Sequence, residues 1–210
     1  PDHVAGNDEV CSEFPEAALL VPADEHEKIA SLISTKISGR LAHGDVVGVG
    51  GSVWNVIATP GHTSGHISLQ SMLDMLCGDT LFAAGAGNCR SGDPQVLFKT
   101  FDGVIRNLPG ATALYPGHDY AVRNLEFALS IDATAHTRDA LVKAQSHPDE
   151  FRPVILEDEL AVNPFLRVWD EAFQDIVRLH APEVWKAWSQ RTVSSSETAF
   201  CVLRELRNSW

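Results

Sequence analysis

Apolar and polar positions in the first part of the chain follow two alternating patterns. Strand-like apolar runs occur at residues 46–49, 53–58, 67–72 and 113–115. Turn signals, such as Gly50-Gly51 and Pro60-Gly61, separate or follow them. Helical spacing occurs at residues 23–38, which end before Gly39, and at residues 94–106. Mixed short strands and helices predict an α/β domain over residues 1–119.

The pattern changes after residue 119. Apolar side chains three or four residues apart begin at Val122, and few strand signals follow. Near the end of the chain, Ser194 and Glu197 form a capping-box pattern. The apolar stripe behind that cap consists of Ala199, Leu203, Leu206 and Trp210. Residues 120–210 are therefore predicted to form a helical domain.

Composition narrows the function classes. The chain has 210 residues, and its 16 Lys and Arg against 28 Asp and Glu give a net charge of −12, which disfavours a nucleic-acid partner. No apolar stretch is long enough to span a membrane. The four cysteines are scattered without C-x-x-C pairing, so we expect reduced thiols in a cytoplasmic protein. The sequence leaves the oligomeric state open, with a monomer as the expected form.

Histidines and aspartates follow the ends of the predicted strands. His62 and His118 each come directly after a Pro-Gly turn, and Asp79 follows a glycine at the end of a third short strand. Asp2-His3 adds an adjacent carboxylate and imidazole. A single Pro-Gly-His is usually only a turn, but four such pieces in one chain favour a metal site. Imidazole and carboxylate together suit zinc, iron or manganese.

The segments Thr59-Pro60-Gly61-His62-Thr63-Ser64-Gly65-His66 and Gly78-Asp79-Thr80-Leu81-Phe82 resemble motifs of the metallo-β-lactamase superfamily. This resemblance implies a four-layer αββα sandwich. It also implies two divalent ions, with zinc expected and iron or manganese left open. Asp2, His3 and His118 would hold one ion, His62 would hold the other, and Asp79 would bridge them. His66 matches a histidine of the superfamily that is not a ligand.

The later part of the chain resembles glyoxalase II, the hydroxyacylglutathione hydrolase family, within that superfamily. The segments that carry this resemblance are Pro116-Gly117-His118-Asp119-Tyr120, Asn163-Pro164-Phe165-Leu166-Arg167 and residues 203–210. It implies that Tyr120, Arg204 and Arg207 bind the glutathione part of a substrate. Arg204 and Arg207 are spaced i, i+3, so they share one helical face. The alternatives are a packing tyrosine and a pair of surface arginines.

The implied reaction is hydrolysis of a glutathione thioester, of the S-lactoylglutathione type, by a hydroxide that bridges two metals. No Ser-His-Asp or Cys-His arrangement offers a protein nucleophile instead. Two alternatives stay open: another hydrolase or persulfide dioxygenase of the same fold, and a non-catalytic remnant. One loop departs from the family pattern, because Asn88 stands where a basic residue is expected and Arg90 is displaced by two positions.

The N-terminus begins inside a motif. The superfamily's first motif reads Thr-His-x-His-x-Asp-His, and only its end is present, as Pro1-Asp2-His3. We therefore expect a parent protein with roughly fifty more residues, which would supply the remaining two histidines and the first strands of the sandwich.

Overall fold

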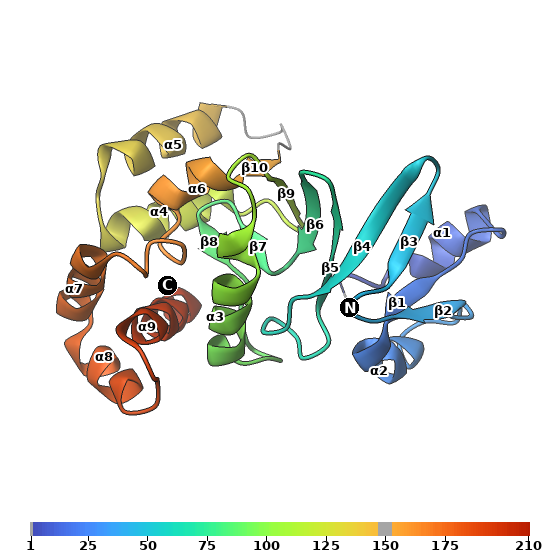
Figure 1. Cartoon of the computed structure of the whole chain (residues 1–210), viewed down its shortest axis with the longest axis horizontal. Coiled ribbons are helices and arrows are strands. Elements are labelled where there is room, and N and C mark those ends of the chain that lie inside the picture. The colour runs from blue at the N-terminus through green and yellow to red at the C-terminus, as the bar shows by residue number, and fades with distance from the viewer. Residues whose placement is uncertain (1, 147–152) are drawn as a thin grey trace.

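A six-stranded mixed sheet forms the centre of the molecule in this computed structural model, which describes residues 2–146 and 153–210 (Figure 1). The strand order is β10-β9-β6-β5-β4-β3. A parallel pair, β1-β2, lies near the N-terminal helices, and β7 and β8 form a hairpin. The strands are β1 (Leu20–Pro22), β2 (Gly39–Leu41), β3 (Val46–Val49), β4 (Ser52–Ala58), β5 (Ile67–Ser71), β6 (Asp74–Gly78), β7 (Leu81–Phe82), β8 (Gly85–Ala86), β9 (Ala113–Pro116) and β10 (Val154–Ile155).

The strands predicted from apolar runs are present. β3 and β4 are joined by the two-residue turn Gly50-Gly51, in which Gly50 has a φ of 57°, a conformation that glycine adopts without strain. The run predicted at residues 67–72 forms β5 but ends one residue early, because Met72 has a φ of 51° and lies in the following turn.

Pairing between β6 and β9 decides where two site residues lie. These two strands run parallel, and Gly78 at the end of β6 is aligned with Pro116 at the end of β9. The Gly117 amide also donates to the Gly78 carbonyl over 3.0 Å. Because the carboxyl ends of parallel strands meet at one edge of a sheet, the residues that follow them, Asp79 and His118, are brought side by side.

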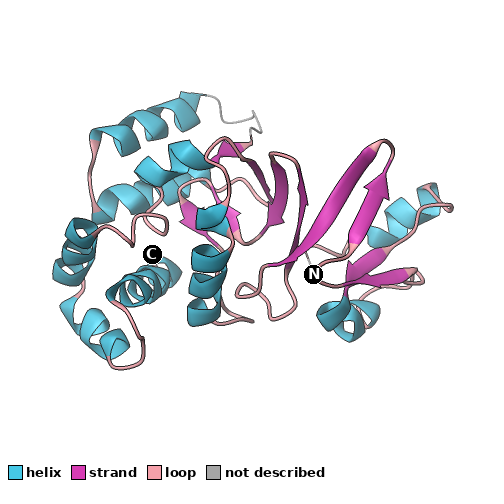
Figure 2. Ribbon diagram, viewed as in Figure 1, coloured by secondary structure: helices cyan, strands magenta, loops and turns pink. Residues whose placement is uncertain are grey.

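The helices lie mainly around the sheet's β10 end (Figure 2). They are α1 (Asn7–Glu13), α2 (His26–Ala30), α3 (Pro94–Gly103), α4 (Ala121–Ile131), α5 (Ala135–Ser146), α6 (Leu156–Val162), α7 (Glu171–His180), α8 (Pro182–Ser189) and α9 (Ser195–Ser209), with 3₁₀ turns at Ala23–Glu25 and Ile105–Asn107. α3 begins at residue 94, where the predicted helix begins, and ends at Gly103. The Asp93 side chain caps the amides of Gln95 and Val96, and Pro94 follows the cap.

The prediction of one long helix over residues 23–38 is wrong. The structure has a 3₁₀ turn followed by the five-residue helix α2, which ends at Ala30. The carboxylate of Asp8 accepts hydrogen bonds from the backbone amides of Ser34 and Thr35, at 2.7 to 3.0 Å. Those amides are therefore bound to a distant side chain rather than to carbonyls four residues back.

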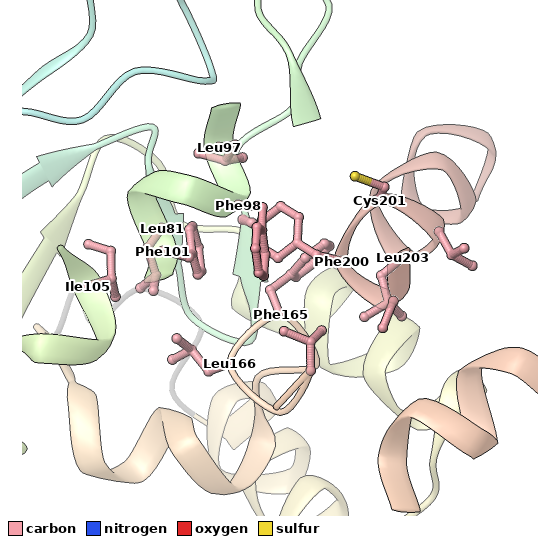
Figure 3. Packing of buried hydrophobic residues seen from close by; sticks show 14 of the residues in the cluster. Leu81, Leu97, Phe98, Phe101, Ile105, Phe165, Leu166, Phe200, Cys201 and Leu203 are labelled. Atoms are coloured by element: carbon pink, nitrogen blue, oxygen red, sulfur yellow. The ribbon is translucent and has the colours of Figure 1, made fainter. Parts of the chain in front are cut away.

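One hydrophobic core joins the sheet and the later helices. Phe200 of α9 contacts Phe101 of α3 and Phe165, with ring centroids 5.0 and 5.2 Å apart (Figure 3). The same cluster contains Met75 and Leu114 of the sheet. The division into residues 1–119 and 120–210 stays a prediction. The two parts share this core, and β10 of the later part pairs with β9.

α9 begins at the predicted cap. The Ser194 hydroxyl accepts from the Glu197 amide at 3.1 Å, while the Glu197 carboxylate accepts from the Val193 amide at 2.8 Å. Ala199 and Leu203 of the predicted stripe are fully buried. Within residues 2–146 and 153–210, no helix combines the length and apolar character that crossing a bilayer requires.

Candidate metal centre

Three predicted ligands follow the ends of three strands of the central sheet, β4, β6 and β9. His62 follows β4 after a turn in which Gly61 has a φ of 135°, Asp79 follows β6, and His118 follows β9. A side chain at position 61 would also collide with the backbone of Leu97, since an added Cβ would lie 2.4 Å from its Cα. Glycine is thus required twice over at the turn that presents His62.

The five residues predicted as ligands converge around Asp79. Its Oδ2 atom has three imidazole Nε2 atoms around it, those of His3 at 3.1 Å, His62 at 3.4 Å and His118 at 3.5 Å. Asp2 completes the group, with its Oδ2 atom 3.5 Å from His118 Nε2. Ligand atoms of Asp2, His3 and His118 all lie within 4.8 Å of one another, which is the trio predicted to share one ion.

The donor set fits divalent cations. Asp79 Oδ1 is buried and, among the described residues, has no hydrogen-bond partner. Such a buried carboxylate oxygen normally needs a partner, and a cation satisfies it. His3 and His118 turn their Nε2 atoms toward each other at 3.2 Å. Nitrogen and oxygen atoms at this spacing form the mixed ligand set that suits zinc, iron or manganese.

A backbone carbonyl orients His62. Its Nδ1–H donates to the carbonyl oxygen of Asn88 over 2.7 Å, which leaves the Nε2 lone pair directed at Asp79. Metal-binding histidines typically have their second nitrogen held in this way. Asn88 was the position at which a basic residue was expected, and its side-chain oxygen accepts from the Arg90 amide at 3.2 Å.

His66 is placed as a structural residue. Its Nδ1 atom lies 2.9 Å from the Thr59 hydroxyl and 3.2 Å from the Thr80 hydroxyl, so that nitrogen is engaged away from the cluster. Burial lowers the pKa of His66 to about 4, which keeps the ring neutral. The ring stands nearly perpendicular to that of His62, with centroids 6.0 Å apart.

A cavity of about 890 Å³ opens beside the cluster. His118 and Tyr120 lie where the cavity meets the cluster, and their rings are stacked at 5.1 Å. Arg123 and Trp210 also line it. Arg207 lies beside this wall, with its guanidinium 5.6 Å from the centre of the Trp210 ring. Tyr120 is exposed and Arg207 is partly exposed, so both are accessible to a ligand.

The structure separates the two predicted arginines. Arg207 donates from Nε and Nη2 to the Asn124 side-chain oxygen, at 3.3 and 3.2 Å. Arg204 instead is only 4% exposed, and its Nη1 donates to the carbonyls of Ala86 and Gly87 at 2.6 and 3.1 Å. Burial lowers the pKa of Arg204 to about 10, so the group stays cationic at neutral pH. A substrate contact for Arg204 stays a prediction, and its observed partners are backbone carbonyls.

Comparison of the chain with known proteins shows the family to which it belongs. The family model for the hydroxyacylglutathione hydrolase C-terminus matches residues 119–210, and the metallo-beta-lactamase superfamily model matches residues 1–130. Hydroxyacylglutathione hydrolases from Nitrosococcus oceani and from a Polaromonas species are each 36% identical to the chain, over 100% of its length and 78% of theirs. The chain belongs to the hydroxyacylglutathione hydrolase family.

Solved structures agree on the fold. The BLEG-1 B3 metallo-beta-lactamase superposes with a TM-score of 0.57 at 19% identity, covering 78% of this chain and 71% of that protein. A metallo-beta-lactamase from Staphylococcus aureus gives 0.56 at 15% identity, covering 96% and 52%. The predicted metallo-β-lactamase fold with a C-terminal helical region is therefore confirmed. The superfamily model, the curated relatives and the donor set together support binding of divalent metal by this chain.

Sequence reasoning missed the residues behind the ligands. The carbonyl oxygen of Asn88 carries no side-chain signature, so nothing in the sequence marks it as the partner of His62. Asn124, Glu159 and Asn163 are buried polar residues that bond to the segment following Asp79. Asn163 does stand in a segment that carries the family resemblance, but that resemblance does not indicate which backbone groups it contacts.

Proposed function

We propose that this chain hydrolyses thioesters of glutathione, of the S-lactoylglutathione type. The observation that carries the proposal is the cluster itself, in which three imidazole nitrogens surround one carboxylate oxygen within 3.5 Å. Its relatives named hydroxyacylglutathione hydrolase support the substrate class. A divalent ion in such a cluster lowers the pKa of a bound water toward roughly 7 and polarises a carbonyl oxygen.

The proposed ligand assignment follows the distances. Asp2, His3 and His118 would hold one ion, His62 would hold the other, and Asp79 would contribute to both. Zinc is the expected metal, with iron and manganese as alternatives. A catalytic zinc normally has three protein ligands. Among the described residues the second ion has only His62 and Asp79, so we expect it to bind more weakly than the first.

Each surrounding residue has a defined task in this proposal. His62 keeps its Nε2 free for the metal because the Asn88 carbonyl holds its Nδ1 proton. Tyr120, stacked on His118, offers its ring and hydroxyl to the glutathione moiety. Arg207 supplies a cation for a glutathione carboxylate on a chain whose net charge of −12 otherwise repels anions. The glutathione part would thus lie against α4 and α9, with the thioester carbonyl at the metals.

The test is a thiol-release assay with the zinc-loaded chain. We expect S-lactoylglutathione to release free glutathione, and the same acyl group on N-acetylcysteamine to react far more slowly, because that thiol lacks the carboxylates. Equal rates on both substrates would indicate a general thioesterase. In a parallel assay with the iron(II)-loaded chain, oxygen consumption with glutathione persulfide would indicate a dioxygenase instead. No turnover of any substrate by a metal-loaded, folded chain would favour the non-catalytic remnant.

A metal titration tests the ligand assignment separately. We expect apo-protein titrated with zinc to show one tight and one weaker binding event. Replacing His62 with alanine should abolish the weaker event and preserve the tighter one, since Asp2, His3 and His118 remain. Loss of both events in His62→Ala would contradict the assignment.

A further inference from the structure

The hairpin that follows Asp79 is held from behind by buried polar side chains. It comprises residues 81–87, with Leu81 aligned to Ala86 and Phe82 to Gly85. Four residues of the later part of the chain bond to its backbone and are at most 6% exposed. We call them the polar clamp: Asn124 on α4, Glu159 on α6, Asn163 at the end of α6, and Arg204 on α9.

The clamp engages the hairpin's turn, its second strand and, through the side-chain amide of Asn163, the Phe82 carbonyl of its first strand at 3.3 Å. Asn124 donates its side-chain amide to the Ala83 carbonyl at 3.0 Å. Glu159 accepts the Ala84 amide at 2.7 Å. Ala84 has a φ of 50°, which a residue with a side chain rarely adopts, so this bond helps to fix a strained turn.

The remaining clamp members bond to the second strand and its exit. The side-chain nitrogen of Asn163 lies 3.1 Å from the Gly85 carbonyl oxygen and 2.9 Å from the Glu159 carboxylate. Arg204 donates to the carbonyls of Ala86 and Gly87. Backbone groups of residues 83–87 are thereby hydrogen-bonded to side chains of α4, of α6 and its end, and of α9.

The other side of the hairpin touches the metal ligands. The Gly87 amide donates to the Thr80 carbonyl at 3.1 Å, and an added Cβ at Gly87 would lie 2.0 Å from the carbonyl oxygen of Asp79. The next residue, Asn88, supplies the carbonyl that orients His62. A shift of the hairpin would therefore displace the backbone that positions both Asp79 and His62.

We propose that the polar clamp is a positioning device through which α4, α6 and α9 set the geometry of the metal ligands, with Arg204 as its central member. Arg204 is suited to this task because one planar guanidinium donates to two adjacent carbonyls and stays charged when buried. It acts through Gly87 and Asn88 on His62. The inference rests on the metal site of the proposed function and gives Arg204 a role other than substrate contact.

The experiment compares Arg204→Met and Arg204→Lys with wild-type protein, using cobalt(II) as the metal probe. Loss of partners behind a metal ligand typically weakens metal binding or activity about 10- to 100-fold. We expect the cobalt(II) dissociation constant to rise by that factor in Arg204→Met and less in Arg204→Lys, which keeps the charge. We also expect kcat to fall while KM for S-lactoylglutathione stays within about twofold.

A second variant and a control separate the possible causes. Asn163→Asp places a carboxylate against the Gly85 carbonyl, so it should weaken cobalt(II) binding from a different part of the clamp. The control is Arg178→Met, since Arg178 lies on α7, is 55% exposed and pairs only with Asp175 among the ion pairs of the described residues. Its cobalt(II) affinity should match wild type. If Arg204→Met does not fold, the cobalt(II) affinities of Arg204→Lys and Asn163→Asp show whether the polar clamp affects metal binding.

Two results would overturn the proposal. Unchanged cobalt(II) affinity in folded clamp variants, with only a lower melting temperature, would mean that the clamp stabilises the fold alone. A raised KM with unchanged kcat and cobalt(II) affinity in Arg204→Met would return Arg204 to the predicted substrate role. If wild-type protein binds cobalt(II) but hydrolyses no thioester, the proposed function fails while the cobalt(II) comparison still judges the clamp.

Discussion

Asp79 is the residue on which the centre depends most. It is the only one of the five predicted ligands that is buried, and its Oδ2 atom lies within 3.5 Å of three imidazole nitrogens. Burying a carboxylate among apolar neighbours is costly unless cations or donors satisfy it. Its partnerless Oδ1 atom shows that the described residues do not do so alone.

Replacing Asp79 with asparagine should therefore remove metal and activity while the fold persists. The amide has nearly the same shape but cannot bridge two cations as a carboxylate does. We expect metal content per chain, measured by atomic emission, to fall and turnover to drop by about 100-fold or more. The control is Asp102→Asn, an exposed residue of α3 that pairs with Arg106. Two metals per chain retained in Asp79→Asn would contradict the bridging role.

Arg207 gives a second prediction at this scale. Its guanidinium lies 5.9 Å from the centre of the Phe127 ring and 5.6 Å from the centre of the Trp210 ring, and the side chain is only partly buried. In Arg207→Ala we expect KM for S-lactoylglutathione to rise with little change in kcat, because the contact is similar in ground and transition states. A charge-assisted contact is worth roughly 1.5–3 kcal/mol. Unchanged kinetics would make Arg207 an ordinary packing residue.

At the residue scale, the sequence can indicate candidate ligands by their side-chain type and local pattern, but not the backbone groups that contact them. His62, Asp79 and His118 could be found because each follows a strand and a glycine, which is a local pattern. The role of the Asn88 carbonyl could not be found, because every residue has a carbonyl and only the fold selects this one. Arg204 shows a further limit. Helical spacing predicts that Arg204 shares a face with Arg207. It does not predict which backbone carbonyls Arg204 contacts.

At the scale of elements, local patterns hold where no distant group competes for the backbone. α3 and α9 begin at Asp93 and Ser194, whose side chains cap the next amides in the chain. The helix predicted at 23–38 fails because Asp8, more than twenty residues away, binds the amides of Ser34 and Thr35. Contacts of this sequence separation cannot be read from a window of helical length.

α6 offers a test of pH dependence. Burial raises the pKa of Glu159 from its ordinary value of 4.5 to about 7. Between these values the unfolded chain has lost the proton and the folded chain retains it, so the free energy of unfolding falls as pH rises from about 4.5 to 7. A shift of this size corresponds to roughly 3 kcal/mol at most.

Glu159→Gln should remove that dependence. The glutamine oxygen can still accept from the Ala84 amide, and it carries no charge to bury. We expect urea unfolding to show the variant gaining stability over wild type between pH 5 and pH 8. The matched control is Glu157→Gln, at an exposed position of the same helix. A stability difference that is the same at both pH values would show that Glu159 does not titrate in this range.

At the scale of the whole molecule, the centre joins parts that are distant in the sequence. The predicted ligands come from residues 2 and 3, from the ends of β4 and β6, and from the turn between β9 and α4. The sequence predicted a sheet part and a helical part, but not that β10 of the later part extends the sheet. That pairing involves two residues on each strand, too short a run for a periodicity to emerge.

Because a metal would bind this assembled site and not the unfolded chain, it should stabilise the fold in proportion to its affinity. Free metal at about 100 times the dissociation constant adds about 2.7 kcal/mol. For a chain of this size each kcal/mol corresponds to about 2–4 °C, so zinc should raise the melting temperature by roughly 5–10 °C over chelated protein. Asp79→Asn should show a much smaller shift. An equal shift in that variant would mean that zinc binds elsewhere, since the Asp79 carboxylate lies within 3.5 Å of the Nε2 atoms of His3, His62 and His118.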